Sequence, residues 1–148
     1  MKCKLWSHQN EYLKVLRDAD VLSGEQIVSS LDLDSNINKI FKAGMGAGKS
    51  GSFFFFSHDS KLIIKTINDS EKKLFVNMLG DLNNHIVERT KNNSLLARIY
   101  GLYSIKSSQF AKFSFILMQI TIQFESSDSQ KVTFDLKGSQ VGRYTKLS

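Results

Sequence analysis

The sequence predicts an α+β domain: a largely antiparallel sheet with one long helix and small helices near the N-terminus. Three observations predict this class. A polar turn at residues 57–60 separates two apolar β-type runs, as in a hairpin. The clearest helical periodicity of the chain then extends from Ser70 to Ile86. After it, apolar and polar residues alternate, which is typical of strands with one buried face.

Length and composition narrow the class of protein. The chain has 148 residues, 41% of them hydrophobic, which suits one domain with its own core. The absence of proline and the ordinary charged fraction exclude collagen-like and largely disordered chains. Cys3 is the single cysteine, which excludes an internal disulfide framework and a cysteine-cluster zinc site and indicates a reducing compartment.

The charge and hydropathy of the chain bear on its location and partners. We find no secretory signal and no apolar run long enough to span a membrane, so a cytoplasmic protein is expected. The net charge of +6 is compatible with an anionic partner. Because the lysines are scattered along the whole chain, a solvated basic surface is the simpler interpretation.

The N-terminal part is predicted to be helical. Residues 1–22 are expected to form a first helix. Its loose apolar stripe consists of Leu5, Tyr12, Leu13, Val15 and Leu16. Ser23 and Gln26 fit a capping box that opens a second helix ending at Leu31. A polar loop and then a short strand are expected next, at residues 32–38 and 37–41.

The middle of the chain is predicted to be a hairpin followed by the long helix. The hairpin strands are residues 53–56 and 62–67. Ser70 is expected to cap the helix, with Glu71 in its first turn. The apolar face of this helix consists of Leu74, Phe75, Met78, Leu79, Leu82 and Ile86.

Three further strands are predicted after the helix. They are residues 95–105, interrupted at Gly101, residues 113–124 and residues 131–137. In the second of them, one face becomes polar from Gln119 onward. We therefore expect that strand to leave the core at this residue.

A glycine-rich stretch precedes the hairpin and fits more than one template. Residues 43–50 come within one residue of a Walker A loop, and Gly46, Gly48 and Gly51 satisfy a dinucleotide-binding pattern. Both motifs require a helix directly after the glycines, whereas phenylalanines that favour a strand follow here. A glycine loop between antiparallel strands is the arrangement found in kinases, where backbone N–H groups approach the phosphates. The kinase arrangement is favoured, and a flexible turn and a P-loop NTPase remain as alternatives.

The kinase interpretation requires a lysine on the next strand, and Lys65 fits that position. It shares a strand face with Ile63 and Ile67. A lysine among isoleucines on a buried strand needs an anionic partner, whereas on an edge strand it would reach water. The partner could be Glu71 or Glu88 on the long helix, and the sequence does not choose between them.

Three motifs in this order resemble the phosphatidylinositol phosphate kinase family, lipid kinases that phosphorylate an already phosphorylated inositol headgroup. They are Gly48-Lys49-Ser50-Gly51-Ser52-Phe53-Phe54, then Ile63-Ile64-Lys65-Thr66, then Phe134-Asp135-Leu136-Lys137-Gly138-Ser139 with Gly142-Arg143. The resemblance covers nearly the whole chain. It implies the N-lobe of an ATP-dependent kinase of the 4-phosphate 5-kinase type. Residues 1–43 would be a helical lead-in, and residues 44–148 would be the nucleotide-binding sheet and helix.

The resemblance also implies roles for particular residues. The implied ATP-binding residues are Gly48, Lys49, Ser50, Gly51, Ser52, Phe53, Lys65, Met118 and Gln119, the last two at the hinge near adenine. The implied border of the active site consists of Asp135, Lys137, Gly138, Ser139 and Arg143. Lys137 and Arg143 would meet an inositol phosphate. Family members often have Asn two residues after the hinge methionine, where this chain has Ile120.

The family's catalytic Asp, metal-binding Asp and activation loop lie beyond the last of these motifs. We therefore expect a C-lobe to be absent, Mg²⁺ ligands to lie outside this chain, no metal site within it, and no activity from the chain alone. The expected partners are ATP and a phosphoinositide at the cytosolic face of a membrane, with peripheral attachment and no nucleic acid. The alternatives are a non-catalytic half-kinase that binds nucleotide or phosphoinositide, a P-loop NTPase and, on charge alone, an RNA-binding protein.

Overall fold

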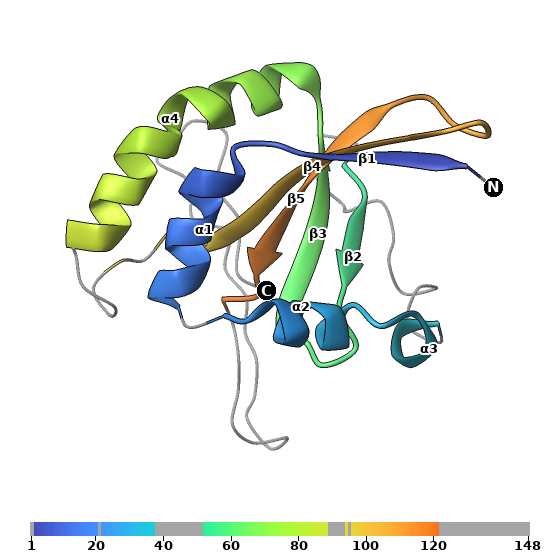
Figure 1. Ribbon diagram of the computed structural model, residues 1–148, viewed down its shortest axis with the longest axis horizontal. Helices are drawn as coiled ribbons and strands as arrows, with labels where there is room; N and C mark the ends of the chain where they lie inside the picture. The colour runs from blue at the N-terminus through green and yellow to red at the C-terminus, as the bar shows by residue number, and fades with distance from the viewer. Residues whose placement is uncertain (1, 21, 38–51, 89–93, 95, 122–148) are drawn as a thin grey trace, which may run out of the picture.

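The computed structural model describes residues 2–20, 22–37, 52–88, 94 and 96–121. These residues form a five-stranded antiparallel sheet with the strand order β1-β4-β5-β3-β2 and helices packed around it (Figure 1). The elements in chain order are β1 (Cys3–Ser7), α1 (Asn10–Ala19), α2 (Gly24–Ser30), α3 (Leu33–Asn36), β2 (Phe54–Phe56), β3 (Leu62–Ile67), α4 (Asp69–Glu88), β4 (Ile99–Ser107) and β5 (Phe113–Gln119). The predicted α+β class is confirmed.

The N-terminal residues form an edge strand where the sequence predicts a helix. Strand β1 pairs antiparallel with β4, and Leu5 lies opposite Ile105. Helix α1 starts only after Gln9, which has a left-handed φ of 53° and no side-chain capping bond. The prediction of a helix over residues 1–22 is therefore wrong for β1, and residues 1–43 are not a purely helical lead-in. Pairing with a strand about a hundred residues along the chain outweighs the local helical pattern here.

Both long helices bury a narrower stripe than the sequence predicts. Among the side chains of α1 that the structure describes, Leu13 and Leu16 are the buried ones. The buried apolar residues of α4 are Phe75, Leu79, Leu82 and Ile86, which recur at the spacing of one helical face. The exposed members of the predicted stripes are Leu5, Tyr12, Val15, Leu74 and Met78. They lie on the flanks of each helix or, for Leu5, on β1.

The short helices follow the capping signals. Ser23 and Gln26 form the predicted capping box at the start of α2, with both reciprocal hydrogen bonds present. Residues 32–38 were expected to be a loop, but they include the one-turn helix α3. The side chain of Asp32 accepts from the backbone N–H of Ser35, which gives this turn its N-cap.

Apolar clusters lie on both faces of the sheet. On one face, α1 and α4 pack against β4 and β5, with Leu102 and Ile116 at the centre of the cluster. On the other face, Leu62 and Leu117 pack with residues in and beside α2. These residues are Leu22, Ile27 and Leu31. Figure 1 shows α1 and α4 together at one end of the sheet, so β3 and β2 extend beyond their cover.

The strands after the hairpin largely follow the prediction. Strand β4 has a register shift between Ile99 and Gly101, where an interruption was expected. A Cβ atom at Gly101 would overlap the ring of Tyr103, which explains the glycine. Strand β5 ends at Gln119, as the change to polar residues predicted. Residues 38–41, 122–124 and 131–137, which were predicted to be in strands, lie outside the described residues.

Candidate functional site

Lys65 occupies the middle of β3, on the face of the sheet that α4 covers farther along. It pairs with Phe54 of β2 on one side and with Ile116 of β5 on the other. Its Nζ atom lies 3.5 Å from Oε1 of Glu71, and its side chain is 27% exposed. The lysine therefore has both a carboxylate partner and an open route to solvent or to a ligand.

Glu71 is held in place by the start of α4. Its backbone N–H donates to Oδ1 of Asn68 (2.8 Å), and its Oε2 accepts from the backbone N–H of Asn68 (2.9 Å). This reciprocal pair is a capping box, so the cap is Asn68 and the prediction of Ser70 is wrong. One carboxylate oxygen thus fixes the helix start, and the other faces Lys65.

Glu88 is not the partner of Lys65. It is the last residue of α4, seventeen residues after Glu71. At 1.5 Å per residue the two positions are about 25 Å apart along the helix. The structure therefore resolves the choice that the sequence left open in favour of Glu71.

The end of the glycine-rich stretch lies beside Lys65. The backbone N–H of Phe53 donates to Oγ1 of Thr66 (2.8 Å), and the N–H of Thr66 donates to the carbonyl of Phe53 (3.0 Å). Residues 54–56 continue as β2, so a strand follows the glycines and the Walker A interpretation is wrong. Ser52 is buried, whereas Gly48, Lys49, Ser50 and Gly51 lie outside the described residues.

An apolar surface extends from Lys65 toward the end of β5. Ile63, Phe54 and Phe56 share the face of Lys65, as their strand pairing requires, and Phe56 is 47% exposed. Met118 of β5 pairs with Ile63, which is two residues from Lys65 on β3, so Met118 lies on this face as well. Such a surface, with a cation at one end, suits a flat apolar ring that carries an anionic group.

The two predicted hinge residues face opposite sides of the sheet. Met118 packs against the α1–α4 cluster, whereas Gln119 pairs with Leu62 on the other face. The backbone N–H of Gln119 donates to the carbonyl of Arg98 (2.9 Å), which fixes the end of β5. The polar border residues Asp135, Lys137, Gly138, Ser139 and Arg143 lie outside the described residues.

Sequence reasoning missed a polar cluster between β1, α4 and the sheet. Nζ of Lys72 lies 3.0 Å from Nε2 of His8 and donates to Oγ of Ser104 (3.1 Å), which contacts Ser114 (2.8 Å). An ammonium can only donate, so His8 accepts at Nε2 and is neutral. Burial, followed by the charges of Lys72 and Lys112, lowers the pKa of His8. The four residues are far apart in sequence and form no motif.

A second network ties α1 to the start of β4. Nε of the buried Arg98 lies 3.3 Å from Oδ2 of Asp20, and the hydroxyl of Tyr100 donates to the same oxygen (3.0 Å). Burial and the neighbouring Asp20 raise the pKa of Tyr100, so its hydroxyl stays protonated. Arg98 also carries the carbonyl that fixes Gln119, so this network supports the predicted hinge.

The described residues contain no group of three or more His, Cys, Asp or Glu side chains that could hold a metal ion. At Lys65 the nearest carboxylate, Glu71, is already used by Asn68 and by the lysine itself. The described part of the site therefore does not fit a Mg²⁺ ligand set. In the same part of the chain, no helix is long and apolar enough to cross a membrane.

Comparison with known proteins gives a consistent result. Residues 35–148 match the sequence profile of the family described as Phosphatidylinositol-4-phosphate 5-Kinase. The chain is 41% identical over 96 residues to phosphatidylinositol 4-phosphate 5-kinase 9 of Arabidopsis thaliana, covering 65% of this chain and 11% of that protein. It is 44% identical over 96 residues to a probable phosphatidylinositol phosphate kinase of Dictyostelium discoideum, covering 65% of this chain and 13% of that protein.

A third relative is the phosphatidylinositol 4-phosphate 5-kinase its3 of Schizosaccharomyces pombe. The two chains are 42% identical over 96 residues, covering 65% of this chain and 12% of that protein. The chain thus spans only about an eighth of the length of the curated relatives it matches. The profile match extends over most of the chain and includes β2, β3, α4 and the Asp135–Ser139 motif. On this evidence the chain belongs to the phosphatidylinositol-4-phosphate 5-kinase family.

Proposed function

We propose that this chain is the ATP-binding lobe of a kinase that phosphorylates the headgroup of a phosphatidylinositol phosphate, at the 5-hydroxyl of an inositol ring that already carries a 4-phosphate. The observation that carries the proposal is the Lys65–Glu71 ion pair on β3, directly beside the strand that leaves the glycine-rich stretch. A lysine oriented by a carboxylate and facing the end of a glycine loop is suited to binding nucleotide phosphates.

The proposed nucleotide lies along β3. Its phosphates contact Lys65 and the backbone N–H groups of the glycine-rich stretch, Gly48 to Gly51. Its adenine rests on the apolar surface at Ile63 and reaches the strand end at Met118 and Gln119. The apolar character of this surface and its cation at one end support this orientation.

We assign binding of the lipid headgroup to the Asp135–Ser139 motif and to Arg143. We assign the inositol phosphate to Lys137 and Arg143, one as a point charge and the other as a planar donor. The metal ion that phosphoryl transfer needs is assigned, by the family resemblance, to a metal-binding Asp beyond the Asp135–Ser139 motif. The 148 residues alone are accordingly expected to bind ATP without transferring phosphate. Phosphorylation of a phosphoinositide by the purified chain would overturn this expectation.

The nucleotide part of the proposal is tested by titrating the 148-residue chain with ATP in a calorimeter. Lys65→Met is expected to weaken binding by about tenfold or more, since a hydrogen bond between charged groups contributes about 1.5–3 kcal/mol. Lys61→Met is the matched control, because Lys61 lies in the same hairpin, 67% exposed and paired with Asp59. Equal affinity in wild type and Lys65→Met would remove Lys65 from the site.

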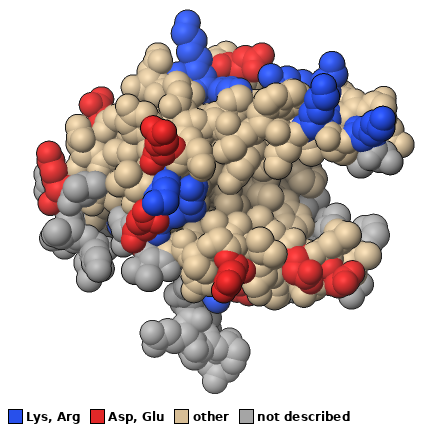
Figure 2. Space-filling view, in the orientation of Figure 1, with Lys and Arg blue, Asp and Glu red and all other residues tan. Residues whose placement is uncertain are grey.

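A group of lysines at one end of the sheet, which we call the basic tip, supports the proposal that the chain contacts an anionic membrane. We use this name for the projecting end of β1 and of the β4–β5 hairpin, where lysines gather at the upper right of Figure 2. The lysines are Lys2, Lys4, Lys106 and Lys112. Residues 2–10 and 99–121 contain no Asp or Glu. Trp6, Phe110 and Phe113 are partly exposed there, and Nζ of Lys112 lies 5.0 Å from the centroid of the Trp6 ring. Lysines beside exposed aromatic rings suit the interface of an acidic lipid surface.

Vesicle co-sedimentation tests the basic tip. Lys4→Glu with Lys112→Glu is expected to weaken binding to phosphatidylserine vesicles by about tenfold or more, since each lysine contributes about 1 kcal/mol. Lys14→Glu with Lys61→Glu changes the net charge equally at positions outside the tip and is the control. Equal losses in both double variants would assign membrane binding to net charge and not to the tip.

A further inference from the structure

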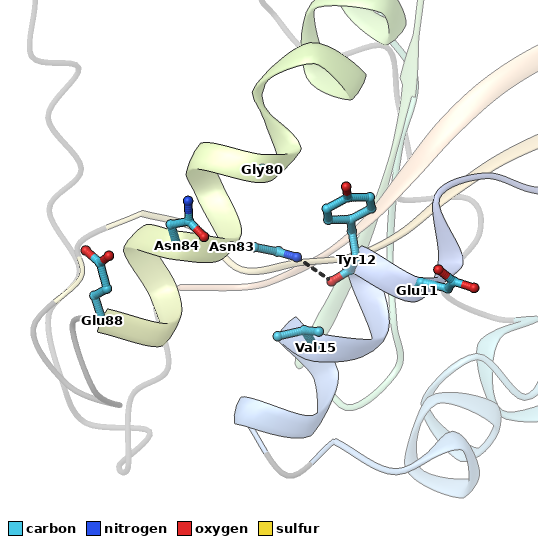
Figure 3. Close-up of a pocket in the computed structure, with 7 residues that line it drawn as sticks. All are labelled: Glu11, Tyr12, Val15, Gly80, Asn83, Asn84 and Glu88. Atoms are coloured by element: carbon cyan, nitrogen blue, oxygen red, sulfur yellow. Dashed lines mark hydrogen bonds between the residues drawn. The ribbon is translucent and has the colours of Figure 1, made fainter.

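A groove of about 700 Å³ runs between α1 and α4, on the side of the helices away from the sheet. Figure 3 shows its two walls: Tyr12 and Val15 project from α1, and Asn83 and Asn84 from α4. Tyr12 is 48% and Val15 41% exposed, although both were expected to face the core. An amphipathic helix with two exposed apolar side chains beside a groove has a surface that a further element could cover.

Gly80 lies in the floor of this groove, in the middle of the twenty-residue helix α4. Glycine is less favourable than alanine in a helix interior, because it has more conformational freedom to lose. Nothing described explains its presence, since a Cβ atom there would meet no atom within 4 Å and the backbone does not have a positive φ. A missing side chain at an open groove is what allows another backbone to approach α4 closely.

Asn83, one turn beyond Gly80, has a buried acceptor without a donor. Its Nδ2 donates to the backbone carbonyl of Tyr12 (3.1 Å), as the dashed line in Figure 3 marks. That carbonyl can only accept, so the amide orientation is fixed and Oδ1 must point elsewhere. The side chain is 8% exposed, and Oδ1 has no hydrogen-bond partner in the structure. An acceptor of this kind is stabilised by a donor brought in by a ligand.

The charge of the groove identifies the kind of ligand. Glu11 and Glu88 lie at its opposite ends (Figure 3), and no lysine or arginine is among the described residues that line it. This acidic lining contrasts with the net charge of +6 for the chain. Apolar side chains in the middle and carboxylates at both ends complement a helix that has an apolar face flanked by basic residues.

We propose that the α1–α4 groove is a docking site for an amphipathic, basic helix of a partner protein. The backbone of that helix lies against Gly80, and its apolar face covers Tyr12 and Val15. Its lysine or arginine side chains pair with Glu11 and Glu88, and one of them donates to Asn83. This docking needs no nucleotide, so its test is independent of ATP binding at Lys65.

The experiment measures binding of a labelled model peptide to the 148-residue chain by fluorescence anisotropy. The peptide is about 18 residues long, about five helical turns, with a leucine face flanked by lysine and arginine. One control peptide has the same composition in an order that destroys the apolar face, and the other has glutamate in place of the basic residues. Saturable binding of the basic helix alone is expected, and equal binding of either control overturns the proposal.

Variants of the chain locate the site. Gly80→Leu and the pair Glu11→Gln with Glu88→Gln are each expected to weaken binding by about tenfold or more. Asp81→Leu and Asp81→Asn are the matched controls for bulk and charge, because Asp81 is exposed beside Gly80 but does not line the groove. Gly80→Leu replaces a poor helix former with a good one, so α4 is expected to fold, and circular dichroism checks this. Unchanged affinity in both groove variants would overturn the proposal.

Two further measurements keep the result interpretable. In the isotope-labelled wild-type chain, the peptide is expected to shift amide signals of α1 and of the second half of α4, and shifts elsewhere alone would contradict the proposal. Sedimentation velocity tests the other possible occupant, a second copy of the chain. Self-association that Gly80→Leu abolishes would assign the groove to that copy and overturn the assignment to a basic partner.

Discussion

Glu71 performs two tasks that a pair of substitutions can separate. Its carboxylate caps α4 through Asn68 and pairs with Lys65. Glutamine also serves in a capping box, so Glu71→Gln keeps the bond to Asn68 and removes only the negative charge. Glu71→Ala removes both. Comparing the two variants therefore distinguishes the helix cap from the ion pair.

The expected magnitudes follow from the geometry. A lost cap costs about 1 kcal/mol. The ion pair is partly exposed, 27% and 35% on the two side chains, and such pairs contribute only up to about 1 kcal/mol. Glu71→Gln should therefore lower the free energy of unfolding by less than about 1 kcal/mol, and Glu71→Ala by about 1–2 kcal/mol. Both should reduce ATP affinity equally, because both leave Lys65 without its partner.

Urea unfolding and ATP titration of the same preparations check these values. Glu88→Gln is the control, since Glu88 ends the same helix far from Lys65. If Glu71→Gln destabilises the chain as much as Glu71→Ala, the cap is not preserved by glutamine and the structural part of the argument fails. If Glu71→Gln leaves ATP affinity at the wild-type value, the ion pair does not orient Lys65 for phosphate.

Two further predictions concern the fold. Leu102 is fully buried between the sheet and the helices, so Leu102→Ala should lower the free energy of unfolding by about 3–5 kcal/mol. Urea unfolding measures this loss, and Leu33→Ala, at an exposed position, is the control. Equal losses in the two variants would contradict the packing. Burial and the nearby lysines lower the pKa of His8, so the folded state favours the neutral form of this side chain. Stability should be full above pH 6.5, the ordinary pKa of His8, and decline as pH falls below it, seen as a lower urea midpoint. His8→Gln should remove this decline, and an unchanged decline would assign it to other groups.

The hairpin and its lysine could be predicted because they depend on neighbouring residues. Phe54 and Lys65 pair across a short turn, and Asn68 and Glu71 close the next helix within one turn. Strand β1 could not be predicted in this way, since its partner β4 is about a hundred residues away and its own sequence has no strict alternation. The same reasoning explains the His8 cluster, which exists only because β1 pairs with β4 and α4 crosses the sheet.

The predicted helix faces were too wide for a related reason. Apolar residues at Tyr12, Val15, Leu74 and Met78 fit a helical stripe, but the sheet contacts only part of each helix surface. Periodicity shows that a helix has an apolar side and does not show how much of that side its own chain covers. The excess at Tyr12 and Val15 lies beside the α1–α4 groove, so this failure of the sequence prediction points to a surface that a partner could cover.

The position of the Lys65–Glu71 pair also bears on what such a partner could do. Strand β3 ends at Ile67 and α4 begins at Asp69, so only Asn68 separates them. The lysine and the glutamate are six residues apart and are held by this junction and its capping box. The groove residues that α4 contributes lie in the second half of that helix. A pair held by the local chain is less sensitive to a shift of the far end of the helix than a pair formed from mid-helix. Docking in the groove should therefore leave ATP affinity close to its undocked value, and a large change would mean that α4 moves as a rigid rod about its first turn.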